Sequence, residues 1–175
     1  MTVATPETHP SHGDGQTPDN RERIKVKARV LVRRGDEVLL EQRLDAWGAP
    51  FFRPLGGNIE FGEAGIVAAA REFQEETGFH LEAARYLTAL EDLGDGPSGP
   101  WHEVTLLFEA SVAEAAFYVQ DTVAVRETGG RSFTAHWVAV ADLPGLGGRL
   151  RPPGLLHWLP GAGTLRETRP TGGAL

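Results

Sequence analysis

Three glutamates near the middle of the chain have the spacing that would bring their side chains together on a helix. Glu72, Glu75 and Glu76 stand at i, i+3 and i+4, and residues so spaced are neighbours on a helix surface. Like charges at i,i+4 destabilise a helix by roughly 0.2–0.5 kcal/mol per pair. A hard divalent cation among the carboxylate oxygens would relieve that repulsion. The alternative is an acidic helix face in contact with water.

The three glutamates belong to a longer pattern. Residues 57–79 read GNIEFGEAGIVAAAREFQEETGF, which has the form G-x5-E-x7-R-E-U-x-E-E-x-G-U, where U is an apolar residue. The matching positions are Gly57, Glu63, Arg71, Glu72, Phe73, Glu75, Glu76, Gly78 and Phe79. Since each residue type makes up about 5–10% of proteins, a chance match at a given start is on the order of one in a billion.

This segment resembles the signature box of the Nudix hydrolases, and the similarity extends from about residue 24 to 143. The resemblance implies an α/β fold, a Nudix-type α/β/α sandwich with a mixed β-sheet, in which the box forms a loop–helix–loop. It implies a metal-dependent hydrolase that cleaves the pyrophosphate linkage of a nucleoside diphosphate linked to another group. The alternatives are a non-hydrolytic, nucleotide-binding regulatory module of the same family and a structural domain with an acidic helix.

The resemblance also implies roles for the box residues. Glu72, Glu75 and Glu76 would bind Mg²⁺, with Mn²⁺ able to substitute, since both ions prefer oxygen ligands. One glutamate in the family often serves as general base, so Glu75 and Glu76 are also catalytic candidates. Which glutamate is the base stays open, because a metal-bound carboxylate is usually a poor base. Arg71 is expected to orient a neighbouring glutamate.

Residues around the start of the box are candidates for supporting roles. Glu63 is expected at the helix start, where the dipole favours a carboxylate, either as a capping group or as an auxiliary metal ligand. Gly56 and Gly57 are expected to allow close approach of the backbone to the substrate, and the resemblance implies that Gly57 brings a carbonyl towards the metal. Arg53 could donate two hydrogen bonds to a phosphate or pair with a nearby acid.

Nudix enzymes often recruit one more acidic residue from a later loop, as metal ligand or base. Glu127 is the first candidate, because it lies in a segment expected to be a polar loop, and Glu103 is the second. A solvated surface carboxylate is the alternative for both. Trp47, Phe52 and Trp101 could stack on a base or could serve as packing residues.

Hydrophobic periodicity predicts the elements that carry these residues. A strand with period-two alternation begins at Ile24, and a turn at 34–36 leads to a returning strand at 38–42. The helix is expected over about 63–77, ending at Gly78. Its core-facing stripe is expected to lie roughly 130° around from the carboxylates, and consists of Ile66, Ala69, Ala70, Phe73 and Thr77. The other expected elements are an aromatic loop at 47–54, strands at 81–90, 103–112 and 133–140, a polar loop at 121–131 and a short helix at 152–159.

Length and composition limit the class of protein. The 175 residues fit one domain, expected at 23–160, between a disordered N-terminal tail (1–22) and a loose C-terminal tail (161–175). There is no cysteine, and no apolar run approaches the roughly 18–20 residues that span a bilayer. We therefore expect a cytoplasmic protein with no membrane partner. The net charge of −7 argues against nucleic-acid binding but not against a small nucleotide-type substrate, and a homodimer is left open.

Overall fold

The computed structural model describes residues 23–97, 99–127 and 130–159. The two tails expected at 1–22 and 161–175 lie outside the described residues. The elements are β1 (Ile24–Arg34), β2 (Glu37–Leu44), β3 (Pro50–Arg53), α1 (Gly65–Thr77), β4 (Leu81–Gly94), β5 (Trp101–Val112), α2 (Ala115–Tyr118), β6 (Thr122–Arg126), β7 (Ser132–Ala139) and the 3-10 helices η2 (Val140–Arg149) and η3 (Leu155–Trp158).

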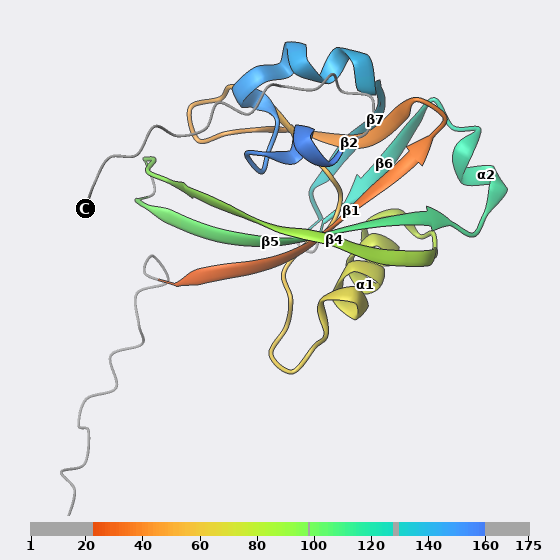
Figure 1. Ribbon diagram of the computed structural model, residues 1–175, viewed down its shortest axis with the longest axis horizontal. Helices are drawn as coiled ribbons and strands as arrows, with labels where there is room; N and C mark the ends of the chain where they lie inside the picture. Colours follow the sequence, from red (N-terminus) through yellow and green to blue (C-terminus); the bar gives the residue numbers. More distant parts are fainter. Residues whose placement is uncertain (1–22, 98, 128–129, 160–175) are drawn as a thin grey trace, which may run out of the picture.

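The strands form one mixed sheet in the order β4-β5-β1-β2-β7-β6, with β3 paired to β2. Strand β1 is the centre of this sheet, because it pairs in parallel with β5 and antiparallel with β2. Helix α1 covers one face, whereas η2 and η3 cover the other (Figure 1). The predicted α/β/α sandwich with a mixed sheet is therefore confirmed.

Two apolar clusters hold the layers together, one on each face of the sheet. The alternation of side chains along β1 supplies both, since Val30 faces the cluster under α1 and Leu31 faces the cluster under the 3-10 helices. Phe73 of α1 packs in the first cluster against Phe117, with 5.7 Å between ring centroids. Leu143 and Leu155 belong to the second cluster. Packing of Phe73 in the first cluster thus fixes α1 on one face of the sheet.

The orientation of α1 differs from the predicted one. The helix begins at Gly65, two residues later than expected. Ile66 is 45% exposed and Ala70 is exposed, so these two were wrongly placed in the core. The buried residues of α1 are instead Ala68, Ala69, Phe73 and Glu76. The helix presents two adjacent alanines to the sheet, and this rotation buries one of the three glutamates.

Several predicted segments contain additional structure. The polar loop expected at 121–131 contains β6, which pairs with β7 and buries alternate residues. The aromatic loop expected at 47–54 ends in β3, paired with β2. The expected short helix near the C-terminal end is confirmed as η3, in 3-10 form. None of the helices in the described ranges has the length and apolar character required to cross a membrane.

Candidate active site

The segment that leads into α1 is fastened to β1 by backbone hydrogen bonds. Val30 N–H donates to the carbonyl of Leu55 (2.9 Å), and Ala28 N–H donates to the carbonyl of Gly57 (3.0 Å). Gly56 lies between them with φ at 126°, and a Cβ there would stand 2.1 Å from the carbonyl oxygen of Ala28. Only glycine fits this close approach. The start of the box is therefore held at a fixed position against the sheet.

Gly57 provides the space that the Glu72 side chain occupies. A Cβ on Gly57 would stand 2.2 Å from Oε2 of Glu72 and 2.3 Å from its carboxyl carbon. The carboxylate therefore lies directly against the backbone of the loop. The structure thus brings Gly57 and Glu72, 15 residues apart in the sequence, into contact.

Glu76 is the buried member of the cluster, with 6% of its surface exposed. Its Oε2 accepts a hydrogen bond from Gly56 N–H at 3.0 Å. Burial, followed by repulsion from Glu41, raises the pKa of Glu76 to about 7. The interpretation that all three glutamates point away from the core is wrong for Glu76.

Arg71 links the loop to the helix. Its Nε and Nη2 donate to the two oxygens of Glu63 at 2.9 and 3.0 Å, and its Nη1 donates to Glu72 at 3.1 Å and Glu75 at 3.3 Å. The hydrogen bond from Arg71, followed by that from Glu60 N–H, lowers the pKa of Glu63 to about 2. Arg71 is thus placed as expected, next to the glutamates it would orient.

Glu63 does not cap α1. The N-cap is Ala64, without a side-chain hydrogen bond, and Glu63 accepts instead from Glu60 N–H (3.0 Å) and from Arg71. The Glu63 carboxylate is engaged by these two partners and accepts no hydrogen bond from the first N–H groups of the helix. The capping interpretation is therefore wrong, and Glu63 closes its own loop.

The structure places Glu127 beside the box glutamates, but not Glu103. Glu127 follows β6 directly and lines a pocket of about 240 Å³ together with Glu72, Glu75 and Glu76. Glu103 lies in β5 outside that lining, 3.8 Å from Arg29. The remaining residues around this box pocket are Lys27, Arg53, Gly56, Gly57, Asn58 and Arg126.

Arginines surround Glu127. Arg43 donates to its Oε1, Arg131 pairs with its Oε2 at 2.9 Å, and Arg53 lies 3.9 Å from Oε1. Partial burial acts to raise the pKa of Glu127, but the hydrogen bond and charge of Arg43 outweigh it, so the pKa lies below the ordinary value. Glu127 is therefore ionised at neutral pH.

A buried ionic network supports the box pocket from the sheet, and our sequence reasoning missed it. Arg29 is 1% exposed and donates to the carbonyls of Pro54 (2.9 Å) and Gly56 (3.1 Å). Glu41 is fully buried and accepts from Arg53 at 2.5 Å and from Arg43 at 3.2 Å. Burial lowers the pKa of Arg29 to about 10, which leaves it protonated at neutral pH. The sequence shows only charged residues in and next to the predicted strands, and charged residues in such positions normally face water.

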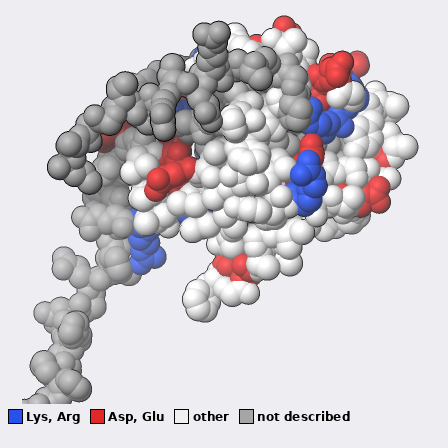
Figure 2. Space-filling model, viewed as in Figure 1, with Lys and Arg blue, Asp and Glu red and all other residues white. Residues whose placement is uncertain are grey.

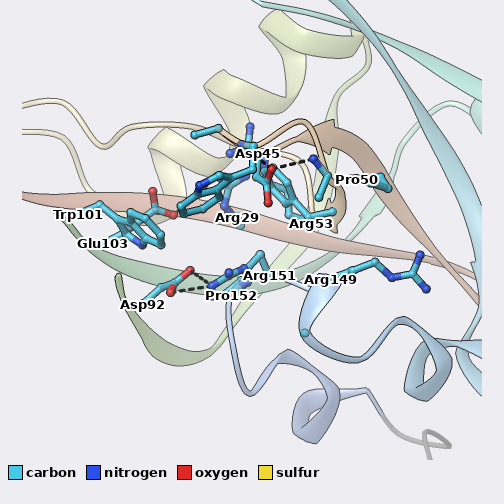
Figure 3. A pocket seen from close by; sticks show the side chains of 15 residues that line it. Arg29, Asp45, Pro50, Arg53, Asp92, Trp101, Glu103, Arg149, Arg151 and Pro152 are labelled. Atoms are coloured by element: carbon cyan, nitrogen blue, oxygen red, sulfur yellow. Dashed lines mark hydrogen bonds and ion pairs between the residues drawn. The ribbon is translucent and has the colours of Figure 1, made fainter. Parts of the chain in front are cut away.

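A second pocket, of about 310 Å³, lies on the other side of Arg53. We call it the aromatic pocket, because Trp47, Phe51 and Trp101 line it. Figure 3 shows Trp101 and Glu103 on one side of it, with Arg53, Asp45 and the hydrogen-bonded pair Asp92–Arg151 around the rest. Arg53 lines both pockets.

Two of the three aromatic residues proposed for stacking line the aromatic pocket. Phe52 does not, because it packs against the apolar cluster under the 3-10 helices. Successive side chains of a strand point to opposite faces, so its neighbour Phe51 faces the pocket instead.

The residues of the box pocket suit a divalent cation by their chemistry. The donors are carboxylate oxygens, and Gly57 leaves room for one of them beside the backbone. In the described residues no three carboxylates converge closely enough to hold an ion, because Arg71 holds Glu72 and Glu75 whereas Gly56 N–H holds Glu76. The side chains would have to turn away from these partners to converge on one ion.

The model of the NUDIX domain family matches residues 23–159, more than half of the chain. The chain belongs to the Nudix family. This Nudix domain is 33% identical over 125 residues to an NAD-capped RNA hydrolase, NudC, from Yersinia enterocolitica, covering 71% of this chain and 41% of that protein. It is 36% identical over 84 residues to the NudC of Yersinia pestis, covering 46% of this chain and 28% of that protein. The Nudix domain thus spans less than half the length of these curated relatives.

The fold is similar to that of solved Nudix proteins. A NUDIX hydrolase from Nitrosomonas europaea superimposes with a TM-score of 0.54 at 20% identity, covering 78% of this chain and 86% of that one. At this level of identity the likeness concerns the fold alone.

Proposed function

We propose that this Nudix domain hydrolyses the pyrophosphate linkage of a nucleoside diphosphate joined to another group, with a divalent metal ion as cofactor. The observation that carries the proposal is the complete box, whose three helix glutamates line one pocket together with Glu127. The curated relatives support the substrate class, because they are NAD-capped RNA hydrolases and NAD contains a pyrophosphate between two nucleosides. A regulatory module would have no need for all four carboxylates.

Glu72, Glu75 and Glu76 would hold the ion, which we propose is Mg²⁺ with Mn²⁺ as a substitute. When bound, such an ion neutralises phosphate charge and lowers the pKa of water. The chain gathers the carboxylates around one pocket, where Arg71 holds Glu72 and Glu75 and Gly56 N–H holds Glu76, and a bound ion would replace these partners. This arrangement supplies positioning and charge, which are the main needs of phosphoryl and nucleotidyl transfer.

Glu127 and Arg53 would act on the water and the substrate. Glu127 is ionised and can accept a proton or a hydrogen bond from a water in the box pocket, while Arg43 holds its other lone pairs. Arg53 is 18% exposed and anchored to Glu41, so its remaining N–H groups can donate to a phosphate that lies between the two pockets.

A panel of pyrophosphates tests this proposal. The full chain with Mg²⁺ is incubated with NAD, ADP-ribose, nucleotide sugars and dinucleoside polyphosphates, and products are separated by chromatography. We expect two phosphorylated products from at least one member and none from the Glu75→Gln variant. Metal-dependent binding without any product would favour the regulatory module instead.

We further propose that small nucleotides, rather than capped RNA, are the substrates of this chain. The net charge is −7, and the described residues on the face shown in Figure 2 carry scattered basic and acidic side chains without a continuous basic surface. RNA-backbone binding needs several Lys or Arg contacts and weakens steeply with salt. We expect kcat/KM for NAD to equal or exceed that for NAD-capped RNA, and to change little between 50 and 200 mM salt, about the range over which backbone binding collapses. A strong preference for the RNA would contradict this.

A further inference from the structure

We propose that the aromatic pocket binds the nucleobase of the substrate between Trp47 and Trp101, with the diphosphate passing Arg53 to reach the box pocket. This inference rests on the proposed function and adds where the nucleoside lies. The pocket draws its lining from β1, the β2–β3 loop, β3, the ends of β4 and β5, the end of η2 and the segment after it. None of these segments belongs to the box.

Two glycines hold the indoles close to each other. A Cβ on Gly96 would stand 3.3 Å from the ring of Trp101 and 3.4 Å from the ring of Trp47. A Cβ on Gly94 would stand 2.0 Å from the ring of Trp101. The edges of both rings therefore lie close to Gly96, and a side chain at Gly94 would collide with the ring of Trp101.

The loop that carries Trp47 is fixed, although the side chain is 63% exposed. The Asp45 carboxylate accepts hydrogen bonds from the N–H groups of Trp47 (2.9 Å) and Ala49 (2.8 Å), and Asp45 N–H donates to the carbonyl of Ala49 (2.9 Å). These bonds close a tight turn. The chain thus holds a large apolar ring in water at a defined position. Because the loop is already ordered, a ligand that stacks on this ring loses less conformational entropy on binding.

Within the described residues, neither indole of the aromatic pocket is stacked on another aromatic ring, and Trp101 lies with one side of its ring against Gly94. In the described part of the chain neither Trp47 nor Trp101 packs ring-to-ring against another aromatic side chain, unlike Trp137, which stacks on Tyr118. Stacking on an aromatic side chain is a main way in which proteins hold a base, whatever its sequence identity. The volume of about 310 Å³ is at the lower end for small-molecule sites. It suits one nucleoside better than a whole dinucleotide.

Arg53 connects this pocket with the catalytic one. Arg53 lines both pockets, and its guanidinium carbon lies 5.9 Å from the ring centre of Phe51. A nucleoside in the aromatic pocket would therefore direct its phosphates towards the glutamates. The carboxylates of Asp92 and Glu103, also in the lining, can accept hydrogen bonds from N–H groups on the edge of a base.

Binding without metal separates this inference from hydrolysis. The full chain in chelator-containing buffer is titrated with AMP, GMP, CMP, UMP and ribose 5-phosphate, followed by calorimetry and tryptophan fluorescence. We expect at least one nucleotide to bind on the order of tenfold or more tightly than ribose 5-phosphate and to quench fluorescence. Trp47→Ala and Trp101→Ala should each weaken its binding on the order of tenfold to a hundredfold, and Trp47→Phe should restore most of it.

Matched variants keep the result interpretable. Trp158→Phe, outside the pocket, should keep both affinity and quenching. Because Trp47 is largely exposed, Trp47→Ala should leave the melting temperature unchanged and decides the question alone if Trp101→Ala does not fold. Equal binding of ribose 5-phosphate and all four nucleotides, or unchanged affinity in Trp47→Ala, would overturn the inference. Hydrolysis with Mg²⁺ on the same preparation reports separately on the proposed function, which can fail while base binding persists.

Discussion

Gly56 and Gly57 are adjacent, yet the structure requires a glycine at each for a different reason. A side chain at 56 would collide with the backbone of Ala28, whereas a side chain at 57 would collide with the carboxylate of Glu72. The first contact is with a strand that cannot move, and the second is with the end of a flexible side chain. One position should therefore govern stability and the other catalysis.

Substitution by alanine tests this difference. Gly57→Ala should displace Glu72 and lower kcat/KM by roughly tenfold to a hundredfold, the range for residues that position metal ligands, with little change in melting temperature. Gly56→Ala should lower the free energy of unfolding by about 1–3 kcal/mol. An alanine at this position would have a strained backbone conformation, and its Cβ would clash with the backbone of Ala28. Steady-state kinetics and urea unfolding of both variants measure the two effects. A Gly57→Ala enzyme with full activity would show that Glu72 does not need its observed place.

Glu127→Gln probes the carboxylate opposite the helix. It should lower kcat by roughly the 10²–10⁴ expected for a lost general base, with KM nearly unchanged. Glu103→Gln is the matched control for kcat, because that residue also pairs with an arginine, Arg29, but lies outside the box pocket. Since Glu103 lines the aromatic pocket, any effect of this change on substrate binding should fall on KM. If the control variant is the impaired one, the roles are reversed. If neither matters, the box glutamates activate the water without help.

Metal removal tests the box glutamates together. We expect excess chelator to abolish turnover and added Mg²⁺ or Mn²⁺ to restore it. Among the described residues, the box pocket is lined by four glutamates and by only three cationic side chains, Arg53, Lys27 and Arg126, so without a metal ion its carboxylates would repel the phosphates. Product formation is followed before and after each addition. Turnover that continues undiminished in chelator would mean that these arginines and the lysine suffice.

At the scale of elements, the sequence predicted the strands and α1 better than the faces they bury. The box and the alternation in β1 are local signals, and both elements lie close to where they were expected. Which side of α1 is buried depends on the tertiary contacts available to it. One of these is Phe117 of the unpredicted α2, which packs on Phe73. Strand β6 was missed because its five residues alternate within an otherwise polar segment.

The orientation of α1 leads to a prediction about stability. Phe73→Ala removes a fully buried ring and should lower the free energy of unfolding by about 3–5 kcal/mol. Ile66→Ala, predicted from the sequence to be a core change, should alter it by only about 0.5 kcal/mol, because the side chain is 45% exposed. Urea unfolding of the two variants compares them directly. Similar losses for both would mean that the helix is rotated towards the predicted face.

At the scale of the whole molecule, the sequence predicted one domain and a cluster of box residues but not the ionic network beneath that cluster. The network residues lie in strands that are close to the box in space but separate from it in sequence: Arg29 in β1, and Glu41 and Arg43 in β2. No local pattern distinguishes a strand arginine that faces water from one that supports a loop through its carbonyls. The aromatic pocket could not be predicted for the same reason, since its lining is assembled from segments that are separate in the sequence.

The boundaries of the domain can be tested by shortening the chain. A protein limited to residues 23–160 should keep its kcat/KM and melt within about 4 °C of the full chain, the shift that corresponds to about 1 kcal/mol. The family match over residues 23–159 supports these limits. Calorimetry and the substrate panel on both chains provide the comparison. A large loss of activity in the shorter chain would mean that the terminal segments contribute to the site.

Arg53 makes the two pockets thermodynamically dependent on each other. Its guanidinium is the closest counter-charge of Glu41, which is fully buried and repels Glu76. A ligand that draws Arg53 away from Glu41 therefore changes the electric field at the glutamates, and a cation among the glutamates changes how firmly Arg53 is held. Whatever factor one ligand applies to the affinity of the other, the second must apply to the first. We therefore expect reciprocal cooperativity between an ion and an uncleaved nucleotide, transmitted by this one shared side chain.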